Sequence, residues 1–100
     1  MKLYSTKNKS KLFSLKEAVM KGLPADNGLF MPTDLPSLPA DFIDQIKDYS
    51  FRDLAFQVAR TLIGQESISD DALGQIITES INFPAPLISL SDRLHILELF

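Results

Sequence analysis

The stretch that decides the fold reads Ser50-Phe-Arg-Asp-Leu-Ala-Phe-Gln-Val-Ala-Arg-Thr-Leu-Ile-Gly64. Ser50 can accept a hydrogen bond from the first helical turn and Asp53 can bond back to the cap, which is the pattern of a capping box. Gly64 is a typical residue just beyond a helix end. Because apolar residues recur every three or four positions in between, the stretch predicts a central helix that is contacted on more than one side. Its apolar residues are Phe51, Leu54, Ala55, Phe56, Val58, Ala59, Leu62 and Ile63.

Three further helices are predicted around this one. A second capping box at Ser14-Leu-Lys-Glu17 predicts a helix of about two turns that ends at Gly22. A cap at Ser69, followed by two aspartates in the first turn, predicts a helix over residues 69–82. An apolar stripe over residues 42–49 predicts another helix. The expected buried faces are Phe42, Ile43, Ile46 and Tyr49 in that helix and Leu73, Ile76, Ile77 and Ile81 in the last one.

Short strands are predicted before, between and after the helices. Residues 3–6 form an extended segment, and residues 28–31 are the part of a proline-rich loop, residues 24–39, that is expected to pair as a strand. Residues 87–90 and 94–100 have the pattern of a hairpin. The elements together predict an α+β fold, a small domain of about four helices with a few short strands that include a C-terminal hairpin. The side chains expected to pack the loop are Leu29, Phe30, Leu35 and Leu38.

The last predicted strand is apolar up to the end of the sequence. Five of the seven residues in 94–100 are apolar, whereas domain ends are usually exposed and polar. We therefore expect residues 1–100 to be a single domain cut from a longer polypeptide. An uncovered apolar strand edge would also favour self-association of the isolated chain.

Composition excludes several classes of protein. The chain has 100 residues, of which 45% are hydrophobic and 23% charged, so it is a globular domain too small for a typical cofactor-binding α/β enzyme. It contains no cysteine and a single histidine, which excludes disulfide frameworks, thiolate metal sites and cysteine nucleophiles. No stretch approaches the ~20 apolar residues of a membrane span, and the first residues do not resemble a signal peptide. We expect a cytoplasmic protein with no membrane partner.

Positive charge is concentrated at the beginning of the chain. Residues 1–21 carry six lysines and one acid, whereas residues 22–100 carry four basic and twelve acidic residues. Lys7, Lys9 and Lys11 could contact a phosphate backbone, so a weak anion or RNA binder is one alternative. Nucleic-acid readers usually combine such a run with arginine and exposed aromatic residues, which this run lacks. We expect the run to be a solvated loop and expect no nucleic-acid partner.

No pattern of residues points to a catalytic, cofactor-binding or metal site. His95 is the only candidate base, and Glu98 three residues later falls on the other face of the predicted strand. We expect His95 to be a strand-surface residue or a hydrogen-bonded core residue. The four glycines form no phosphate-binding motif, and the acidic residues lack calcium-loop spacing. The acidic residues considered are Asp41, Asp44 and Asp48 on one predicted helix and Asp70 and Asp71 on another.

Six short segments form a series that spans essentially the whole chain. They are Met1-Lys-Leu-Tyr-Ser-Thr6, Ser14-Leu-Lys-Glu-Ala-Val-Met-Lys-Gly-Leu23, Asp26-Asn-Gly-Leu-Phe-Met-Pro32, Phe51-Arg-Asp-Leu-Ala55, Phe83-Pro-Ala-Pro-Leu87 and Leu97-Glu-Leu-Phe100. In order and spacing this series resembles the amino-terminal region of the threonine synthase family.

The resemblance implies that the chain is the small amino-terminal domain of a fold type II enzyme. The family is a pyridoxal-phosphate-dependent lyase of threonine biosynthesis, which converts O-phospho-L-homoserine and water to L-threonine and phosphate. Its cofactor lysine and phosphate-binding residues lie beyond Phe100, so no catalytic or cofactor residue carries over to this sequence. The resemblance thus implies an inactive fragment that binds no cofactor and whose partners are the remaining catalytic domains of the same polypeptide. A free-standing protein-interaction module is the alternative.

Overall fold

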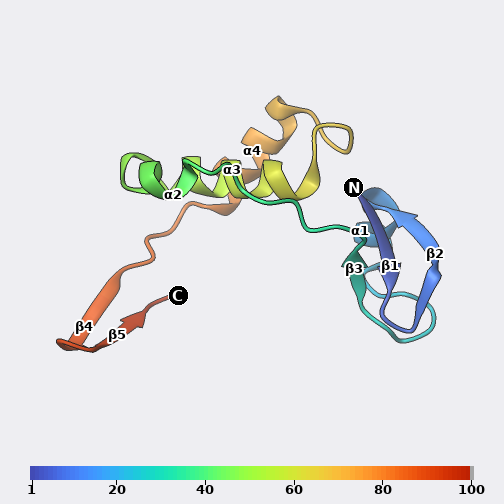
Figure 1. The fold of residues 1–100 in the computed structure, drawn as a ribbon, viewed down its shortest axis with the longest axis horizontal. Helices are drawn as coiled ribbons and strands as arrows, with labels where there is room; N and C mark the ends of the chain where they lie inside the picture. Colours follow the sequence, from blue (N-terminus) through green and yellow to red (C-terminus); the bar gives the residue numbers. More distant parts are fainter. Residues whose placement is uncertain (100) are drawn as a thin grey trace.

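A small sheet, a group of helices and a β-hairpin follow one another along residues 1–99, which the computed structural model describes (Figure 1). The sheet lies at one end of the molecule and the hairpin at the other, with most of the helices between them. The predicted α+β class is confirmed, with four α-helices and a C-terminal hairpin within the described residues.

The first part is a three-stranded antiparallel sheet with one helix, which comes between the second and third strands in the sequence. The strand order is β2-β1-β3, and Leu3 of the central strand pairs with Phe13 on one side and Pro32 on the other. Leu3 and Phe13 are buried together with Ala18 of the helix, so these three residues form the core of this part. The elements are β1 (Lys2–Ser5), β2 (Asn8–Ser14), α1 (Leu15–Lys21) and β3 (Phe30–Pro32).

The capping box predicted for helix α1 is confirmed. The Glu17 carboxylate accepts a hydrogen bond from the Ser14 backbone N–H at 2.8 Å, and the Ser14 hydroxyl accepts one from the Glu17 N–H at 3.2 Å. The bond from the Ser14 backbone N–H, and a second one of 2.8 Å from the Ser14 hydroxyl to the same carboxylate, hold the pKa of Glu17 below its usual value, because they favour the charged form. The helix ends at Gly22, whose φ of 69° lies in the region that glycine adopts readily.

The lysine run is not the solvated loop that the charge pattern predicted, because the chain from Asn8 onward forms strand β2. The ammonium group of Lys9 lies 5.5 Å from the centre of the Tyr4 ring, and that of Lys11 lies 5.3 Å from the Phe13 ring. Cations over aromatic faces are attracted by the ring electrons, so the charges are compatible with a strand here. The strand is at the sheet edge, where lysine is a common protection against unwanted strand pairing.

The proline-rich loop pairs with the sheet slightly later than predicted, at β3, and is mostly exposed. Phe30 packs its ring against the edge of Phe13 at 5.1 Å between ring centres. The expectation that the leucines pack the loop is wrong for Leu29 and Leu35, which are exposed, while Leu38 is half-buried. Prolines fix the extended path of the backbone without requiring a core beneath it.

The second part is helical. Helices α3 and α4 lie side by side, with one residue of α4, Leu73, buried. The predicted capping box of α3 is confirmed by hydrogen bonds of 3.2 and 3.3 Å between Ser50 and Asp53. The elements are α2 (Phe42–Gln45), the 3₁₀ turn η1 (Ile46–Asp48), α3 (Phe51–Ile63) and α4 (Asp70–Ser80).

Three helix predictions need correction. The stripe over residues 42–49 forms a single α-helical turn and a 3₁₀ turn, because Tyr49 must become extended before the Ser50 cap; Ile43 and Ile46 are exposed. Helix α3 was expected to be central, but none of its thirteen residues, all of them described, is buried. Likewise Ile76, expected on the buried face of α4, is exposed.

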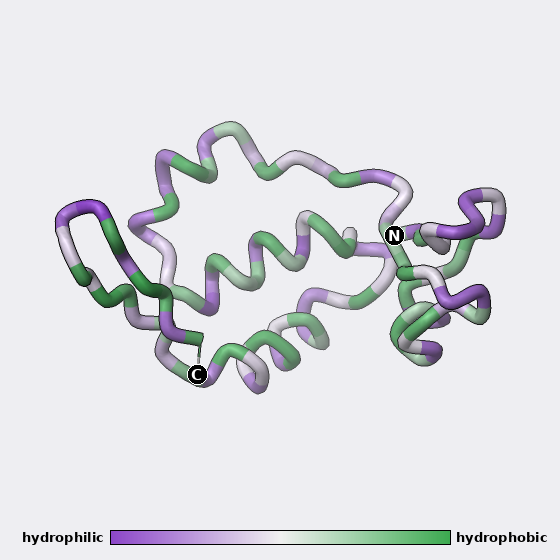
Figure 2. Tube along the Cα trace, turned by 90° about the horizontal axis from the view of Figure 1, so that it is seen from below, coloured by the Kyte–Doolittle hydropathy of each residue, from purple (hydrophilic) through white to green (hydrophobic). Residues whose placement is uncertain are grey.

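The third part is the predicted hairpin, formed by β4 (Leu87–Ser91) and β5 (Leu94–Leu97). The extended residues 83–86 carry it away from the helices (Figure 1). Figure 2 shows hydrophobic positions along both strands and a hydrophilic tip. The second strand was predicted to continue to Phe100, but it ends at Leu97, and residues 98 and 99 are described without strand structure; Phe100 lies outside the described residues.

The molecule is more open than a chain of this size usually is. Its radius of gyration is 16.6 Å, compared with ~13 Å for a compact domain of this length. Its accessible surface of 7696 Å² exceeds by about 2000 Å² the roughly 5700 Å² expected for a folded monomer of 11.2 kDa. Much of the surface that a compact domain would bury is therefore still in contact with solvent.

Candidate functional site

The candidate functional site is the uncovered apolar surface, which is concentrated in three places. The first is a groove of about 410 Å³ between α1 and α4. On its α1 side Val19 and Met20 are exposed, the latter by 80%, and on its α4 side Ile76 is exposed. Exposed apolar patches of this kind usually mark an interaction surface.

The second place is the hairpin, in which every described apolar side chain is exposed by between 41% and 63%. Leu87 pairs with Leu97 and Ile88 pairs with Ile96 across the two strands. Because neighbouring residues in a strand point to opposite faces, one pair lies on each face of the hairpin.

The third place is a hollow of about 620 Å³ between the beginning of α3 and the hairpin. Phe51 of α3 packs edge-on against Phe83 with ring centres 6.3 Å apart. Pro84, Leu97 and Leu99 also line the hollow. The hollow is apolar, so it is suited to an apolar side chain rather than to a charged ligand.

Two arginines fix the helices that carry this surface. Near the end of α3, Arg60 donates hydrogen bonds to the carbonyls of Gly64 at 2.9 Å and Ile68 at 3.0 Å, and pairs with Asp70 at 2.7 Å. At the beginning of α3, the Nε of Arg52 donates to the carbonyl of Ile81 at 2.8 Å. The antiparallel helices α3 and α4 are thus joined at both ends.

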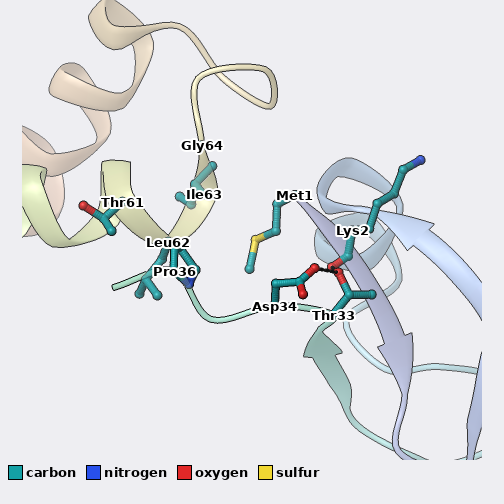
Figure 3. A pocket seen from close by; sticks show the side chains of 9 residues that line it. All are labelled: Met1, Lys2, Thr33, Asp34, Pro36, Thr61, Leu62, Ile63 and Gly64. Carbon is teal, nitrogen blue, oxygen red and sulfur yellow. Dashed lines mark hydrogen bonds between the residues drawn. The ribbon is translucent and has the colours of Figure 1, made fainter. Parts of the chain in front are cut away.

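A pocket of about 310 Å³ connects the sheet to the helices (Figure 3). The Met1 side chain enters it between the end of α3 and the segment that contains Thr33 and Asp34. The amino terminus donates a hydrogen bond of 2.9 Å to the Ser67 hydroxyl. The Thr33 hydroxyl is already engaged with the Lys2 carbonyl and with Asp34, so the pocket contains no converging set of free polar groups.

The turn at residues 26–28 is attached to strand β1 by a polar cluster. The Asp26 carboxylate accepts hydrogen bonds from the buried Ser5 hydroxyl at 2.6 Å and from the Gly28 N–H at 2.9 Å. These two bonds, in that order, lower the pKa of Asp26, and burial raises it by less. Asn27 completes the turn with a φ of 58°.

We predict that Asp26 makes the stability of the chain sensitive to acid. A carboxyl whose pKa is lowered by folding binds fewer protons in the folded state, so its contribution is present above about pH 4 and is lost as the pH falls through the folded pKa. Urea unfolding between about pH 6 and pH 2.5 should show a shallower acid loss for Asp26→Asn than for the unchanged chain. Asp92→Asn at the hairpin tip is the control, and an unchanged slope for Asp26→Asn would contradict the prediction.

The residues singled out from the sequence do not come together in a catalytic arrangement. His95 lies on the exposed hairpin with its Nδ1 2.9 Å from the Ser89 hydroxyl, so it is the strand-surface residue of the two alternatives and not a core residue. Asp41 accepts a hydrogen bond from Gln45 within its own helix. Among residues 1–99, no three His, Cys, Asp or Glu side chains gather as metal ligands would. In the same residues no helix has the length and apolar character needed to cross a membrane.

Sequence reasoning missed the residues that hold the structure together. Arg60 and Arg52 bond to carbonyls 4 to 29 positions away in the sequence, and no local pattern identifies such partners. In the sequence, Asp26 belongs to one of the segments that carry the family resemblance. Its position two residues before Gly28 was the available signal, because aspartate often bonds to a backbone N–H two residues later in a turn.

Comparison with known proteins gives a consistent result. Residues 2–81 match the family model described as "Threonine synthase N terminus". The chain is 42% identical over 101 residues to threonine synthase of Schizosaccharomyces pombe, covering 96% of this chain and 20% of that protein. It is 37% identical to threonine synthase of Saccharomyces cerevisiae over 107 residues, covering 96% of this chain and 21% of that protein.

The fold is also similar to a solved structure. The crystal structure of threonine synthase from Escherichia coli aligns with a TM-score of 0.90 and 33% identity, over 100% of this chain and 23% of that chain. The chain therefore spans between a fifth and a quarter of the length of the relatives it matches. The resemblance found in the six sequence segments is confirmed.

Proposed function

Since this chain belongs to the threonine synthase amino-terminal family, we propose that it is the amino-terminal domain of a threonine synthase, on which the catalytic domains of the same polypeptide pack. The complete enzyme converts O-phospho-L-homoserine and water to L-threonine and phosphate in the cytoplasm. Residues 1–100 form one domain in this proposal, and the catalytic domains lie in the rest of the polypeptide.

The observation that carries the proposal is the excess of exposed surface. About 2000 Å² more surface is accessible than a folded monomer of this mass normally exposes. Interfaces within or between stable protein partners bury areas of about this size. The relatives are four to five times longer than the match, so their remaining parts are large enough to cover it.

The proposed role is not catalytic. Pyridoxal phosphate acts as an electron sink in this class of reaction and is held through a lysine and a phosphate-binding loop. Residues 1–99 do not fit it, because all seven lysines are exposed and none lies in an enclosed cavity with a glycine-rich loop. Lys21, for example, lies over the Phe13 ring at 5.2 Å. We therefore assign no step of the reaction to these residues.

A domain exchange tests the proposal. This chain replaces the aligned first 23% of the E. coli enzyme, and phosphate release from O-phospho-L-homoserine is measured with pyridoxal phosphate present. We expect the chimera to be active. The E. coli enzyme from which the same first 23% is deleted, with nothing put in its place, should be inactive or insoluble, because the covering surfaces would lose their partner. The chain alone should release no phosphate and should not change the absorption spectrum of the cofactor.

Two results of this experiment would contradict the proposal. A soluble and folded chimera without activity would contradict the proposed role, and so would turnover by the chain alone. An unrelated small domain inserted at the same place controls for effects of the junction.

A further inference from the structure

The sequence contains one Asn-Gly pair, Asn27-Gly28, which lies in the turn before strand β3. Asn27 is exposed, whereas Gly28 is buried. In such a pair the backbone nitrogen of the glycine attacks the side-chain amide of the asparagine more readily than in other pairs, because glycine has no side chain that hinders the approach. The other asparagines, Asn8 and Asn82, precede a lysine and a phenylalanine. Asn27 is therefore the asparagine of this chain most suited to deamidation.

The folded turn holds the two reacting groups apart. Ring closure requires the Gly28 nitrogen and the Asn27 β-carbon on the same side of the Asn27 Cα–C bond, since both atoms belong to the ring that forms. The φ of Asn27 is 58°, and a residue with a β-carbon at such a φ has a ψ of about 30–60°. At that ψ the Gly28 nitrogen lies nearly opposite the β-carbon. The reaction therefore requires the peptide between the two residues to rotate by about half a turn.

The Asp26 carboxylate opposes this rotation. It accepts a hydrogen bond from the Gly28 N–H at 2.9 Å, and the buried Ser5 hydroxyl holds it in place by donating to the same oxygen at 2.6 Å. The N–H and the C=O of a trans peptide point in opposite directions, so rotation would replace the N–H donor with the Asn27 carbonyl oxygen. Two acceptors would then face each other without a proton between them, which is unfavourable.

Hydrogen bonds on both sides confine the rotation to this one peptide. Before it, the Asn27 N–H donates to the Pro24 carbonyl at 3.1 Å. After it, the Leu29 N–H donates to the Thr6 hydroxyl and the Leu29 carbonyl accepts from the Thr6 N–H, both at 2.9 Å. Gly28 can absorb the rotation because glycine adopts both signs of φ. The bond to the carboxylate is thus the contact that separates the closed turn from the reactive one.

We propose that Asn27-Gly28 is a site of spontaneous deamidation, which the Asp26 carboxylate keeps closed in the folded chain. When the peptide rotates, the Gly28 nitrogen gives up its proton and forms a bond to the Asn27 Cγ. The Cγ–Nδ2 bond breaks, and the amide nitrogen leaves with a proton as ammonia. Water then opens the succinimide ring. Cleavage at Cγ gives aspartate, whereas cleavage at the backbone carbonyl gives isoaspartate, in which the main chain runs through the side chain.

The isoaspartate product does not fit the closed turn. It adds one carbon to the main chain directly before Gly28, where even a β-carbon would collide with the Ser5 hydroxyl. The added length would also shift β3 relative to β1, in which Ser5 pairs with Phe30. Aspartate keeps the normal main chain and tolerates a positive φ. The closed turn therefore re-forms after conversion to aspartate and stays open after conversion to isoaspartate.

Mass spectrometry of the aged chain tests the site. The chain and a peptide of residues 23–31 are incubated in the same neutral buffer, and the acid forms of Asn27 are followed over time. We expect conversion in the chain to be about 10-fold or more slower than in the peptide, because the hydrogen bond to a charged group must first break. Conversion at the rate of the peptide would overturn the protection. Aspartate without isoaspartate would exclude the succinimide and overturn the site.

Two substitutions test the role of Asp26 as a positioning residue. Asp26→Ala removes the acceptor, so most of the difference between the chain and the peptide should be lost. Asp26→Asn keeps a neutral acceptor and should raise the rate of conversion about threefold, since a neutral hydrogen bond is weaker. Circular dichroism checks that the variants remain folded. A folded Asp26→Asn chain that converts at the rate of the unchanged chain would overturn the role of the carboxylate.

Arg60→Met is the matched control for general loss of stability. It removes two carbonyl hydrogen bonds at the end of α3 and leaves the turn before β3 untouched. We expect conversion of Asn27 in this variant to proceed within about twofold of the rate in the unchanged chain, because the rotation is local. Acceleration equal to that of Asp26→Ala would show that conversion follows general unfolding, and this would overturn the inference.

Discussion

Replacing Arg60 by methionine is expected to lower the free energy of unfolding of this chain by about 2–4 kcal/mol. The Arg60 side chain is only 13% exposed, and its Nη1 donates to the Gly64 and Ile68 carbonyls. Methionine has similar length and packs well, but it leaves both carbonyls without this donor. The pairing with Asp70 adds little, since Asp70 is 59% exposed and water screens the interaction.

Two comparisons make the Arg60 prediction specific. Arg60→Lys keeps the charge but cannot reproduce the fork of guanidinium donors, so it should lose most of the same stability. Arg93→Met, at the exposed hairpin tip, should have almost no effect. Urea unfolding followed by circular dichroism measures all three variants. Equal stability of Arg60→Met and Arg93→Met would show that the two carbonyl bonds do not hold the loop between α3 and α4.

Replacing Gly28 by alanine is the second large expected effect, with a loss of about 2–4 kcal/mol. A β-carbon at this position would collide with the hydroxyl oxygen of the buried Ser5 and would lie 3.0 Å from both the Asp26 carboxylate and the Thr6 hydroxyl. The turn would have to move away from strand β1. This movement would break the bonds of Asp26 and the pairing of Thr6 with Leu29 at 2.9 Å.

A second glycine provides a control of opposite sign. A β-carbon at Gly74, inside helix α4, would approach only the Phe56 ring, at 4.0 Å, which is ordinary contact. Alanine is the better helix former, so Gly74→Ala should raise the free energy of unfolding by about 0.5–1 kcal/mol. The same urea titration measures both variants. Loss of stability in Gly74→Ala, or none in Gly28→Ala, would contradict the described packing.

Local signals were sufficient to predict the capped beginnings of α1, α3 and α4 and the presence of the hairpin. The caps at Ser14 and Ser50 each involve an acid three residues later, so each interaction lies entirely within four consecutive residues of the sequence. The strand from Asn8 was missed because its lysines suggest a solvated loop. Only pairing with β1 and the nearby Tyr4 and Phe13 rings make a strand favourable there.

The site was harder to predict than the fold because it depends on distant contacts. Ser5 meets Asp26 across 21 positions, and Arg52 meets Ile81 across 29. Periodicity correctly identified an apolar face on α3, yet it could not say what covers that face. The relatives are four to five times longer than the match, which supports the proposal that further chain covers this face.

The open surface described above also affects how such an enzyme is made. In the proposed enzyme the amino-terminal domain leaves the ribosome first, and synthesis of a remainder as long as that of the relatives takes tens of seconds at typical elongation rates. During that interval the hairpin edge and the groove beside Met20 are accessible to other nascent chains. If the proposed function holds, we expect chaperones to bind the emerging domain and to leave it once the covering chain is synthesised.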